Sequence, residues 1–253
     1  MNKASRRIAL VTGAAGGIGA KIGARLAADG HHVLLLDVQP AVAETAAALR
    51  TGGFSAEHAI CDITDERAVR ALFEDIERTH GRCDILVNNA GISPKHGGRS
   101  LTAENTPLDE WMAVINVNLT APFLLCRAAA PLMRAQGWGR IVNMASLAGR
   151  TRSIVSGAHY SASKAGLIGF SRMFAGEVAK AGITVNCVAP GAIDAGLAQR
   201  LDPSLTDNYA SRIPVGRIGR PEEVAALVTF IVSEETAFIT GATFDINGGY
   251  LMA

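Results

Sequence analysis

Short apolar runs alternate along this chain with longer segments of helical periodicity. Runs of four to six residues predict buried strands at 8–11, 33–36, 55–60, 84–87, 140–145, 184–188 and 243–246. Apolar positions spaced three or four residues apart predict helices ending near residue 28 and spanning 41–49, 65–79, 108–134, 160–180 and 222–232. Strands that alternate with helices in this way predict an α/β fold with a parallel sheet.

The same alternation runs through the whole chain, without a linker, repeat or low-complexity segment. We therefore expect residues 1–253 to form a single-domain, Rossmann-type, doubly wound sheet of about seven strands, with helices on both faces. Residues 192–213 combine small and polar side chains with weak periodicity, which predicts a mobile flap over the substrate.

A glycine-rich turn separates the first predicted strand from the first helix. Glycines permit a tight turn and bring backbone N–H groups close to a pyrophosphate, beside the positive end of the helix. The strand before it and the helix after it favour nucleotide binding over a plain tight turn. The candidate contacts are Gly13, Ala15, Gly16, Gly17, Ile18 and Gly19.

Asp37 ends the second strand, where dinucleotide folds place the carboxylate that binds a ribose 2′-hydroxyl. A carboxylate there repels the 2′-phosphate of NADP. Val38 follows it and Gly16 stands in the turn, so neither position supplies a base. These features predict NAD as the cofactor, with NADP less favoured; the alternative role for Asp37 is a turn or helix cap.

Polar residues and glycines follow the other strands, at the edge where such sheets bind ligands. We expect Asn89, Ser146 and Pro190 to converge there with Gly13 and Asp37. The further candidate cofactor contacts are Val38, Asp62, Ile63, Asn89, Ala90, Gly91, Tyr160, Lys164, Pro190, Gly191 and Ile193, the last through its backbone.

Tyr160 and Lys164 form a Y-x-x-x-K pair within a predicted helix, where residues four apart share one face. A nearby cation lowers the pKa of a phenol, and acid–base catalysis needs a pKa close to the working pH. The pair is therefore a candidate proton donor and acceptor. His159 precedes Tyr160 but points elsewhere on the helix, so we expect it to be structural or peripheral.

Taken together, these motifs identify the chain as resembling the classical short-chain dehydrogenase/reductase family over essentially its whole length. The resemblance rests on Thr12–Gly19, residues 88–91, Asn118, Ser146, Tyr160-x-x-x-Lys164 and Pro190-Gly191. It implies NAD(P)-dependent hydride transfer between an alcohol and a carbonyl, usually in a homotetramer.

The resemblance also implies roles for single residues. Asn118, Ser146, Tyr160 and Lys164 are its catalytic tetrad, with Asn118 anchoring a water in a proton relay and Lys164 holding the nicotinamide ribose. Ala195 departs from the family, which often has threonine there to contact the cofactor. The polar loop at 93–99 is expected either to cover the substrate or to be a solvated loop.

Composition narrows the partners. The net charge of +1 gives no electrostatic case for nucleic acid or an anionic membrane, and no apolar run approaches the length of a membrane span. The four cysteines, Cys61, Cys83, Cys126 and Cys187, show no metal-binding spacing. They predict reduced core residues, a cytoplasmic location and no metal site.

Three functions remain open. The first is NAD-linked oxidation of a small polar alcohol such as a polyol, a sugar or a hydroxy acid. The alternative is a 3-oxoacyl-[acyl-carrier-protein] reductase, although two arginines that dock the carrier in that group would align with Gly137 and Ala181. A non-catalytic dinucleotide sensor is the alternative of another class, which the intact Tyr160 and Lys164 pair disfavours.

Overall fold

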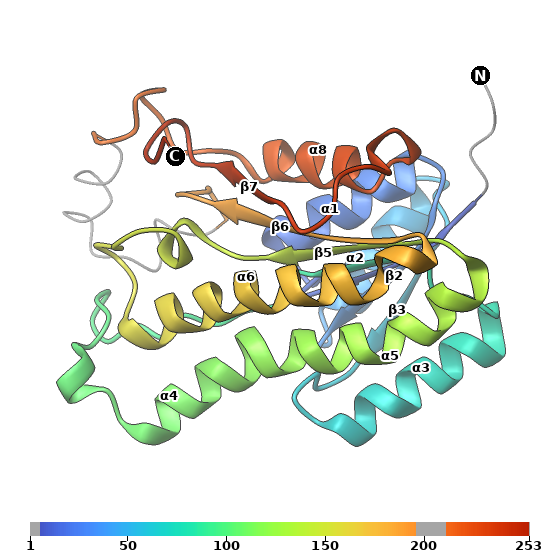
Figure 1. Ribbon diagram of the computed structural model, residues 1–253, viewed down its shortest axis with the longest axis horizontal. Helices are drawn as coiled ribbons and strands as arrows, with labels where there is room; N and C mark the ends of the chain where they lie inside the picture. The colour runs from blue at the N-terminus through green and yellow to red at the C-terminus, as the bar shows by residue number, and fades with distance from the viewer. Residues whose placement is uncertain (1–5, 196–210, 253) are drawn as a thin grey trace.

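The chain folds around a central parallel sheet (Figure 1). The structure is a computed structural model, and it describes residues 6–195 and 211–252. Within them the sheet has seven strands in the order β3-β2-β1-β4-β5-β6-β7, all parallel. The strands are β1 Ile8–Thr12, β2 His32–Asp37, β3 Ala56–Ile60, β4 Ile85–Asn88, β5 Gly139–Met144, β6 Ile183–Pro190 and β7 Thr243–Ile246. The predicted fold class and strand order along the chain are confirmed.

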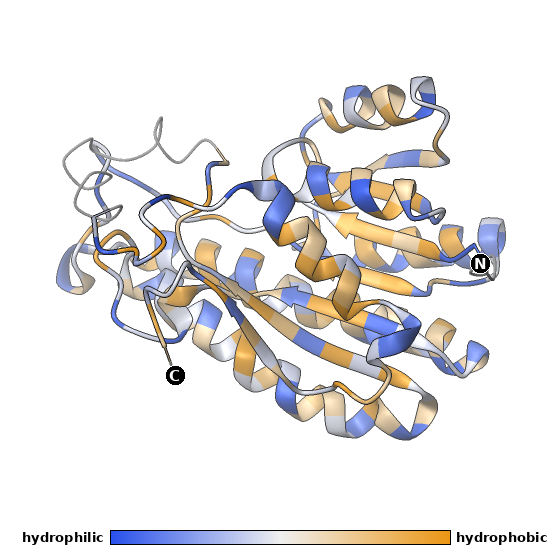
Figure 2. Ribbon diagram, turned by 90° about the horizontal axis from the view of Figure 1, so that it is seen from above, coloured by the Kyte–Doolittle hydropathy of each residue, from blue (hydrophilic) through white to orange (hydrophobic). Residues whose placement is uncertain are grey.

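Two layers of helices cover the sheet (Figure 1). Helices α1 (Gly17–Ala28), α2 (Val42–Thr51) and α8 (Pro221–Ile231) pack on one face, with α1 against α8. Helices α3 (Glu66–His80), α5 (Ala121–Gln136) and α6 (Ala158–Val178) pack on the other. Figure 2 shows hydrophobic residues concentrated along the strands and alternating with polar ones along the helices, the pattern of a sheet buried on both faces.

The helix predicted at 108–134 is interrupted by one wide turn. Helix α4 (Leu108–Ile115) continues through the π-helical turn η2 (Asn116–Thr120) into α5. Such π turns insert a residue into the helical ladder and are frequent at functional sites. Here the turn carries Asn118, which is fully buried.

The combined helix Leu108–Gln136 is long and apolar enough to cross a membrane by length and composition. This differs from the sequence expectation that no segment approaches a span. However, 44% of its most apolar window is buried within the protein. Leu125 and Met133 pack in the core formed with α3, α6 and the sheet, so the helix is a core element of this domain.

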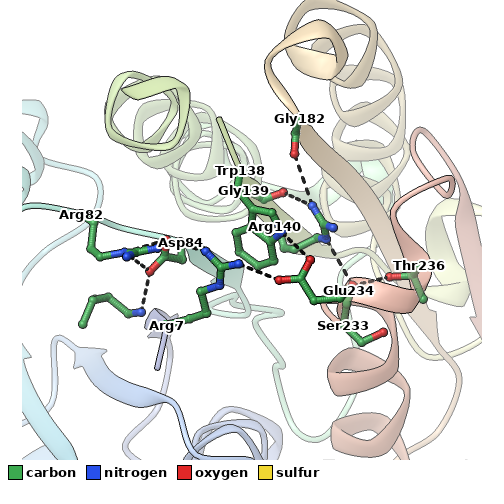
Figure 3. Close-up of polar contacts among 11 residues, drawn as sticks. Arg7, Arg82, Asp84, Trp138, Gly139, Arg140, Gly182, Ser233, Glu234 and Thr236 are labelled. Atoms are coloured by element: carbon green, nitrogen blue, oxygen red, sulfur yellow. Dashed lines mark hydrogen bonds and ion pairs between the residues drawn. The ribbon is translucent and has the colours of Figure 1, made fainter. Parts of the chain in front are cut away.

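A polar network closes the amino end of the sheet (Figure 3). Asp84, which is fully buried, accepts hydrogen bonds from the Arg82 guanidinium at 2.6–3.0 Å and from the backbone N–H of Ile8 at 2.8 Å. Arg7 pairs with Glu234 at 2.6 Å and stacks 3.9 Å above the Trp138 ring. These contacts tie β1, β4 and β5 to the turn after α8.

Four short 3₁₀ turns lie among the connections of the described chain. The short turns at Ala103–Asn105 (η1) and Leu147–Gly149 (η3) precede α4 and α6, and Glu234–Thr236 (η5) follows α8, while Ala179–Ala181 (η4) ends α6. Of the predicted flap at 192–213, residues 196–210 lie outside the described residues. Its first part is anchored, because Asp194 N–H donates to the Gly219 carbonyl at 2.8 Å.

Candidate active site

The turn after β1 is tied to the end of β4, at the point where the strand order reverses. The buried Thr12 hydroxyl accepts the backbone N–H groups of Asn89 and Ala90, each at 3.0 Å. The Asn89 amide donates to the carbonyls of Thr12 at 2.9 Å and Gly13 at 3.1 Å. Asn89 and Ala90 therefore shape the glycine turn.

Glycine is required in this turn for two different reasons. Gly13 has a φ of +66°, and a Cβ on it would lie 2.8 Å from the Ala90 Cα. A Cβ on Gly19 would lie 2.2 Å from the Gly13 carbonyl oxygen. By contrast, a Cβ on Gly16, the N-cap of α1, meets nothing within 4 Å. The chain thus leaves open space at a helix N-terminus, which fits the pyrophosphate of a dinucleotide.

Asp37 lies half-buried at the end of β2, beside this turn. Its two carboxylate oxygens accept the backbone N–H groups of Ala15 and Gln39, each at 3.0 Å. The predicted cap role and the predicted ribose-binding role are therefore compatible, because each oxygen keeps a free lone pair. A 2′-phosphate at this position would meet the carboxylate directly.

Val38, Asp62 and Ile63 are among the predicted cofactor contacts that do not line the central cavity. Val38 and Asp62 are exposed, and Asp62 accepts two hydrogen bonds from Thr64 that lower the pKa of its carboxyl. The Ile63 side chain is buried in the core against α3, which leaves its backbone as the group able to meet a ligand.

A cavity of about 710 Å³ opens beyond the carboxyl ends of β1, β4, β5 and β6. It brings together residues from both ends of the chain. Those predicted from the sequence are Ile18, Asn89, Gly91, Ser146, Tyr160, Lys164, Pro190, Gly191 and Ile193. Those that sequence reasoning missed include Gln39, Ile92, Met144 and Tyr250, which carry no local motif.

Ser146 and Tyr160 both line the cavity, close enough for a hydrogen bond between their side chains. Gly149, three residues after Ser146, approaches α6 so closely that a Cβ would lie 2.7 Å from the Lys164 carbonyl carbon. This contact holds the Ser146 turn against the helix that carries Tyr160. Burial raises the pKa of the Tyr160 phenol, and a hydrogen bond with Ser146 lowers it in part.

Lys164 is anchored at the end of β5. Its ammonium donates to the Met144 carbonyl at 2.7 Å and lies 5.7 Å from the centre of the Tyr160 ring. Burial lowers the pKa of Lys164 to about 8. The hydrogen bond with Ser146 lowers the pKa of Tyr160 in this arrangement, and the effect that the sequence assigns to Lys164 stays a prediction.

Asn118 lies behind the cavity, on the π turn. Its amide accepts the Ile92 N–H at 2.8 Å and donates to the Ile92 carbonyl at 2.9 Å and to Ser163 at 3.1 Å. These contacts fix the chain after Gly91, whose own Cβ would lie 3.2 Å from the Asn118 oxygen. The geometry gives Asn118 a positioning role; the water relay implied by the resemblance stays a prediction.

The loop after β4 lines the cavity rather than standing free. Lys95 donates to Ser93 at 3.0 Å, Ser100 at 2.8 Å and the Val155 carbonyl at 2.7 Å. Burial lowers the pKa of Lys95. Ser93, Pro94 and Lys95 line the cavity, so the interpretation of the loop at 93–99 as a solvated segment is wrong for this part of it.

Glu110 on α4 joins this loop to α6, a contact that sequence reasoning missed. Its carboxylate lies 2.7 Å from His96 Nε2 and 3.0 Å from His159 Nε2. His159 is fully buried and does not line the cavity, which agrees with the structural role expected of it. Glu110 thus holds the loop at 93–99, the mouth loop of the cavity, against the start of the helix that carries Tyr160.

The sequence and the fold both match known oxidoreductases. The family model described as enoyl-(acyl carrier protein) reductase matches residues 13–251. A putative ketoacyl reductase of monensin polyketide synthase from Streptomyces virginiae is 39% identical, covering 98% of each chain. A 2-dehydro-3-deoxy-L-rhamnonate dehydrogenase (NAD(+)) from Sphingomonas sp. is 39% identical, covering 96% of this chain and 94% of its own.

Among solved structures, a 3-oxoacyl-[acyl-carrier protein] reductase with bound NAD from Brucella melitensis superposes with a TM-score of 0.92 and 37% identity. The match covers 99% of this chain and 94% of that one. Full-length similarity of this degree fixes the family, and the cavity carries the Ser146, Tyr160 and Lys164 side chains that the resemblance implied. The chain belongs to the classical short-chain dehydrogenase/reductase family.

Proposed function

We propose that this protein interconverts a secondary alcohol and a ketone by hydride transfer with NAD(H). One observation carries the proposal: Ser146, Tyr160 and Lys164 share a cavity with the glycine-side residues Ile18 and Asn89. Bound NAD would accept or supply the hydride at C4 of its nicotinamide. Gly16 and Asp37 would hold the pyrophosphate and the adenosine ribose, and the backbone of Ile193 the carboxamide.

The protein's own groups handle the proton. In the oxidation direction Tyr160 accepts the proton of the substrate hydroxyl, and Ser146 donates a hydrogen bond to the oxygen as its charge changes. Lys164 contributes in two ways, as a buried cation beside the phenol and as a donor to the nicotinamide ribose.

The coenzyme preference follows from Asp37. A 2′-phosphate would lie against its carboxylate, and a like-charge contact of this kind costs several kcal/mol. We expect kcat/KM with NAD(H) to exceed that with NADP(H) at least tenfold, and Asp37→Ser to narrow the ratio. Measuring kcat/KM for both coenzymes tests this directly; a preference of the wild-type protein for NADPH would overturn it.

For the substrate, the relatives support the alternative better than a small polyol. Two of the three named above are a ketoacyl reductase and a 3-oxoacyl-[acyl-carrier protein] reductase. We therefore place reduction of a 3-oxoacyl thioester first. The expectation of a neutral polyol or sugar substrate receives no comparable support.

A second candidate, a small hydroxy acid, rests on Lys95. This side chain lines the substrate end of the cavity, where Arg152 adds a second cation. Within the described part of the chain, neither Lys95 nor Arg152 forms an ion pair with a carboxylate. Two cations at the mouth suit an anionic substrate, and one relative is named for a deoxy-rhamnonate, which is a sugar acid.

A substrate panel separates these functions. NADH oxidation with 3-oxoacyl thioesters, and NAD reduction with sugar acids, polyols and 3-hydroxyacyl thioesters, should show one preferred class. Lys95→Met should raise KM for an acid substrate and leave that of a neutral thioester analogue nearly unchanged. Arg150→Met is the matched control, because Arg150 is a cation that already forms an ion pair with Asp245 at 3.1 Å. Turnover of no alcohol or ketone would favour the dinucleotide sensor.

The location of the protein is a further proposal. Its four cysteines are free thiols, and burial raises the pKa of Cys83 and Cys126 to about 12. Unpaired, unreactive thiols suit a reducing compartment. We propose that the protein acts in the cytoplasm, and fractionation of cells that express it tests this.

A further inference from the structure

Two histidines and a glutamate meet at the amino end of the sheet, on the side away from the active site. His32 begins β2, Glu57 is the second residue of β3, and His80 ends α3. Leu34 of β2 pairs with Glu57 of β3 and lies two residues from His32. The side chains of His32 and Glu57 therefore share the face of the sheet that α3 covers. One atom from each of the three residues lies within 4.8 Å of the other two.

The separations suit a metal ion. His32 Nε2 lies 3.4 Å from one Glu57 oxygen, and His80 Nε2 lies 3.5 Å from the other. Tetrahedral zinc binds histidine nitrogen and carboxylate oxygen at about 2.0–2.2 Å, which places neighbouring ligand atoms about 3.4 Å apart. The Glu57 side chain is half exposed and leaves room for water as a further ligand.

His32 supplies a second, independent observation. Its side chain is only 8% exposed, yet its Nε2 has no hydrogen-bond partner within the described chain. A buried polar atom left unpaired costs about 1–3 kcal/mol. The other ring nitrogen, Nδ1, lies 2.7 Å from the Ser55 hydroxyl. When Nδ1–H donates to Ser55, the lone pair of Nε2 faces Glu57 and His80.

Among the described residues, Arg6 is the positively charged side chain that contacts His32. Arg6 contacts the Ser55 hydroxyl and lies 3.3 Å from His32 Nδ1, on the side of the ring away from Glu57. A neutral imidazole binds a metal ion through the lone pair of one ring nitrogen. Arg6 therefore weakens the attraction for a cation without occupying the position between the ligands.

We propose that His32, Glu57 and His80 bind a divalent ion of the zinc class, with water completing the coordination. Imidazole and carboxylate ligands suit zinc among the available divalent ions. The ion would join the edge strand β3 and the end of α3 to β2. Its site lies at the opposite end of β2 from Asp37, so binding should stabilise the fold without altering turnover. The sequence expectation of no metal site is revised by this proposal.

Direct titration tests the site. The full-length protein, freed of metal with a chelator and desalted, is titrated with Zn²⁺ against a chromophoric chelator. We expect saturable binding of one ion, weakened at least tenfold in His80→Gln and in Glu57→Gln. His58→Gln is the matched control, because this exposed imidazole follows Glu57 on the other face of β3. Equal affinity in the wild type, His80→Gln and Glu57→Gln would overturn the proposal.

Three further measurements separate this site from the thiols and from misfolding. Bound Co²⁺ should give visible bands without the near-ultraviolet thiolate band that ligation by the half-buried Cys61 would produce. Arg6→Gln should tighten binding several-fold, because it removes the opposing charge and no ligand. Zn²⁺ should raise Tm in the wild type but not in His80→Gln, with kcat unchanged. A thiolate band, or no gain of affinity in Arg6→Gln, would contradict the assignment.

Discussion

The Tyr160 hydroxyl is the group on which the proposed chemistry depends. It lines the same cavity as Ser146 and Lys164, and its hydrogen bond with Ser146 lowers the pKa of the phenol. Tyr160→Phe removes only a hydroxyl, so the fold and the affinity for NAD should persist. We expect kcat to fall about 10²–10⁴-fold, the usual contribution of general acid–base catalysis.

Steady-state kinetics with the preferred substrate and coenzyme measure this loss. Ser161→Ala is the control, because it removes a hydroxyl from the next residue of α6, outside the residues that line the cavity. The control should keep wild-type kcat. A Tyr160→Phe enzyme that kept more than about a tenth of wild-type kcat would show that another group transfers the proton.

Lys164 links catalysis to stability. Its pKa falls from 10.5 in the unfolded chain to about 8 in the fold because of burial. The folded state therefore binds fewer protons between these values, and the free energy of unfolding rises with pH from about 8 to about 10.5. Below pH 8 the buried ammonium opposes folding, in part offset by its hydrogen bond to Met144.

We accordingly expect Lys164→Met to be inactive yet more stable than the wild type at pH 7, by about 1 kcal/mol after allowing for the lost hydrogen bond. The difference should shrink as the pH approaches 10, since Lys164 then folds in its neutral form. Urea denaturation of both proteins at pH 7 and 9.5 measures it. A gap that widened with pH would contradict the assigned direction of the pKa shift.

At the scale of elements, Glu110 couples α4, the mouth loop and α6. The hydrogen bond from His96 lowers the pKa of Glu110, and the bond from His159 adds to it. The free energy that these hydrogen bonds contribute to folding is therefore present above the ordinary carboxyl pKa. It is lost as the pH falls through the lowered pKa of Glu110. The carboxylate keeps Lys95 and the start of α6 in register at neutral pH.

Glu110→Gln should loosen the mouth loop and leave the rate of the chemical step nearly unchanged. Losing about 1 kcal/mol of loop ordering corresponds to about a fivefold rise in KM for the substrate, with kcat nearly unchanged. Initial-rate kinetics at pH 7.5 test this, with Glu104→Gln on the exposed turn before α4 as control. An equal loss of kcat would place Glu110 in the chemical step instead.

Asp84 holds the opposite end of the sheet (Figure 3). It is fully buried and joins Arg82 to the first residue of β1. Asp84→Asn leaves the arginine without its anion, and we expect the free energy of unfolding to fall by about 3 kcal/mol. Urea denaturation at pH 7 measures it, with the exposed Asp75→Asn as control. A change below about 0.5 kcal/mol, typical of a surface substitution, would refute the structural role.

Periodicity predicted the strands and the convergence of their carboxyl ends, because buried parallel strands and their helices have distinct repeats. It did not predict the π turn at Asn118, which depends on a contact with Ile92 that is 26 residues away. Glu110 and the His32–Glu57–His80 cluster were missed for the same reason, whereas Lys95 lies in the loop at 93–99 that the sequence singled out. Each is assembled by folding from positions that no local spacing connects.

At the scale of the whole molecule, α4, α5 and α6 present an apolar strip to solvent. Phe123 is 40% exposed and Met173 68%, and Phe170 stacks on Phe174 at 5.5 Å between ring centres. The strip continues along α4 with the exposed Leu108 and Met112. A contiguous apolar surface of this kind marks an interaction site.

We propose that this strip is one interface of a homotetramer, the assembly that the family resemblance implies. Two charges buried at such an interface are strongly unfavourable. Phe123→Glu combined with Met173→Glu should therefore shift the protein at micromolar concentration from tetramer to a smaller species in sedimentation velocity. Phe54→Glu, at a site of 39% exposure before β3, should leave the tetramer intact. A wild-type monomer, or a double variant that remains tetrameric, would exclude this surface as the interface.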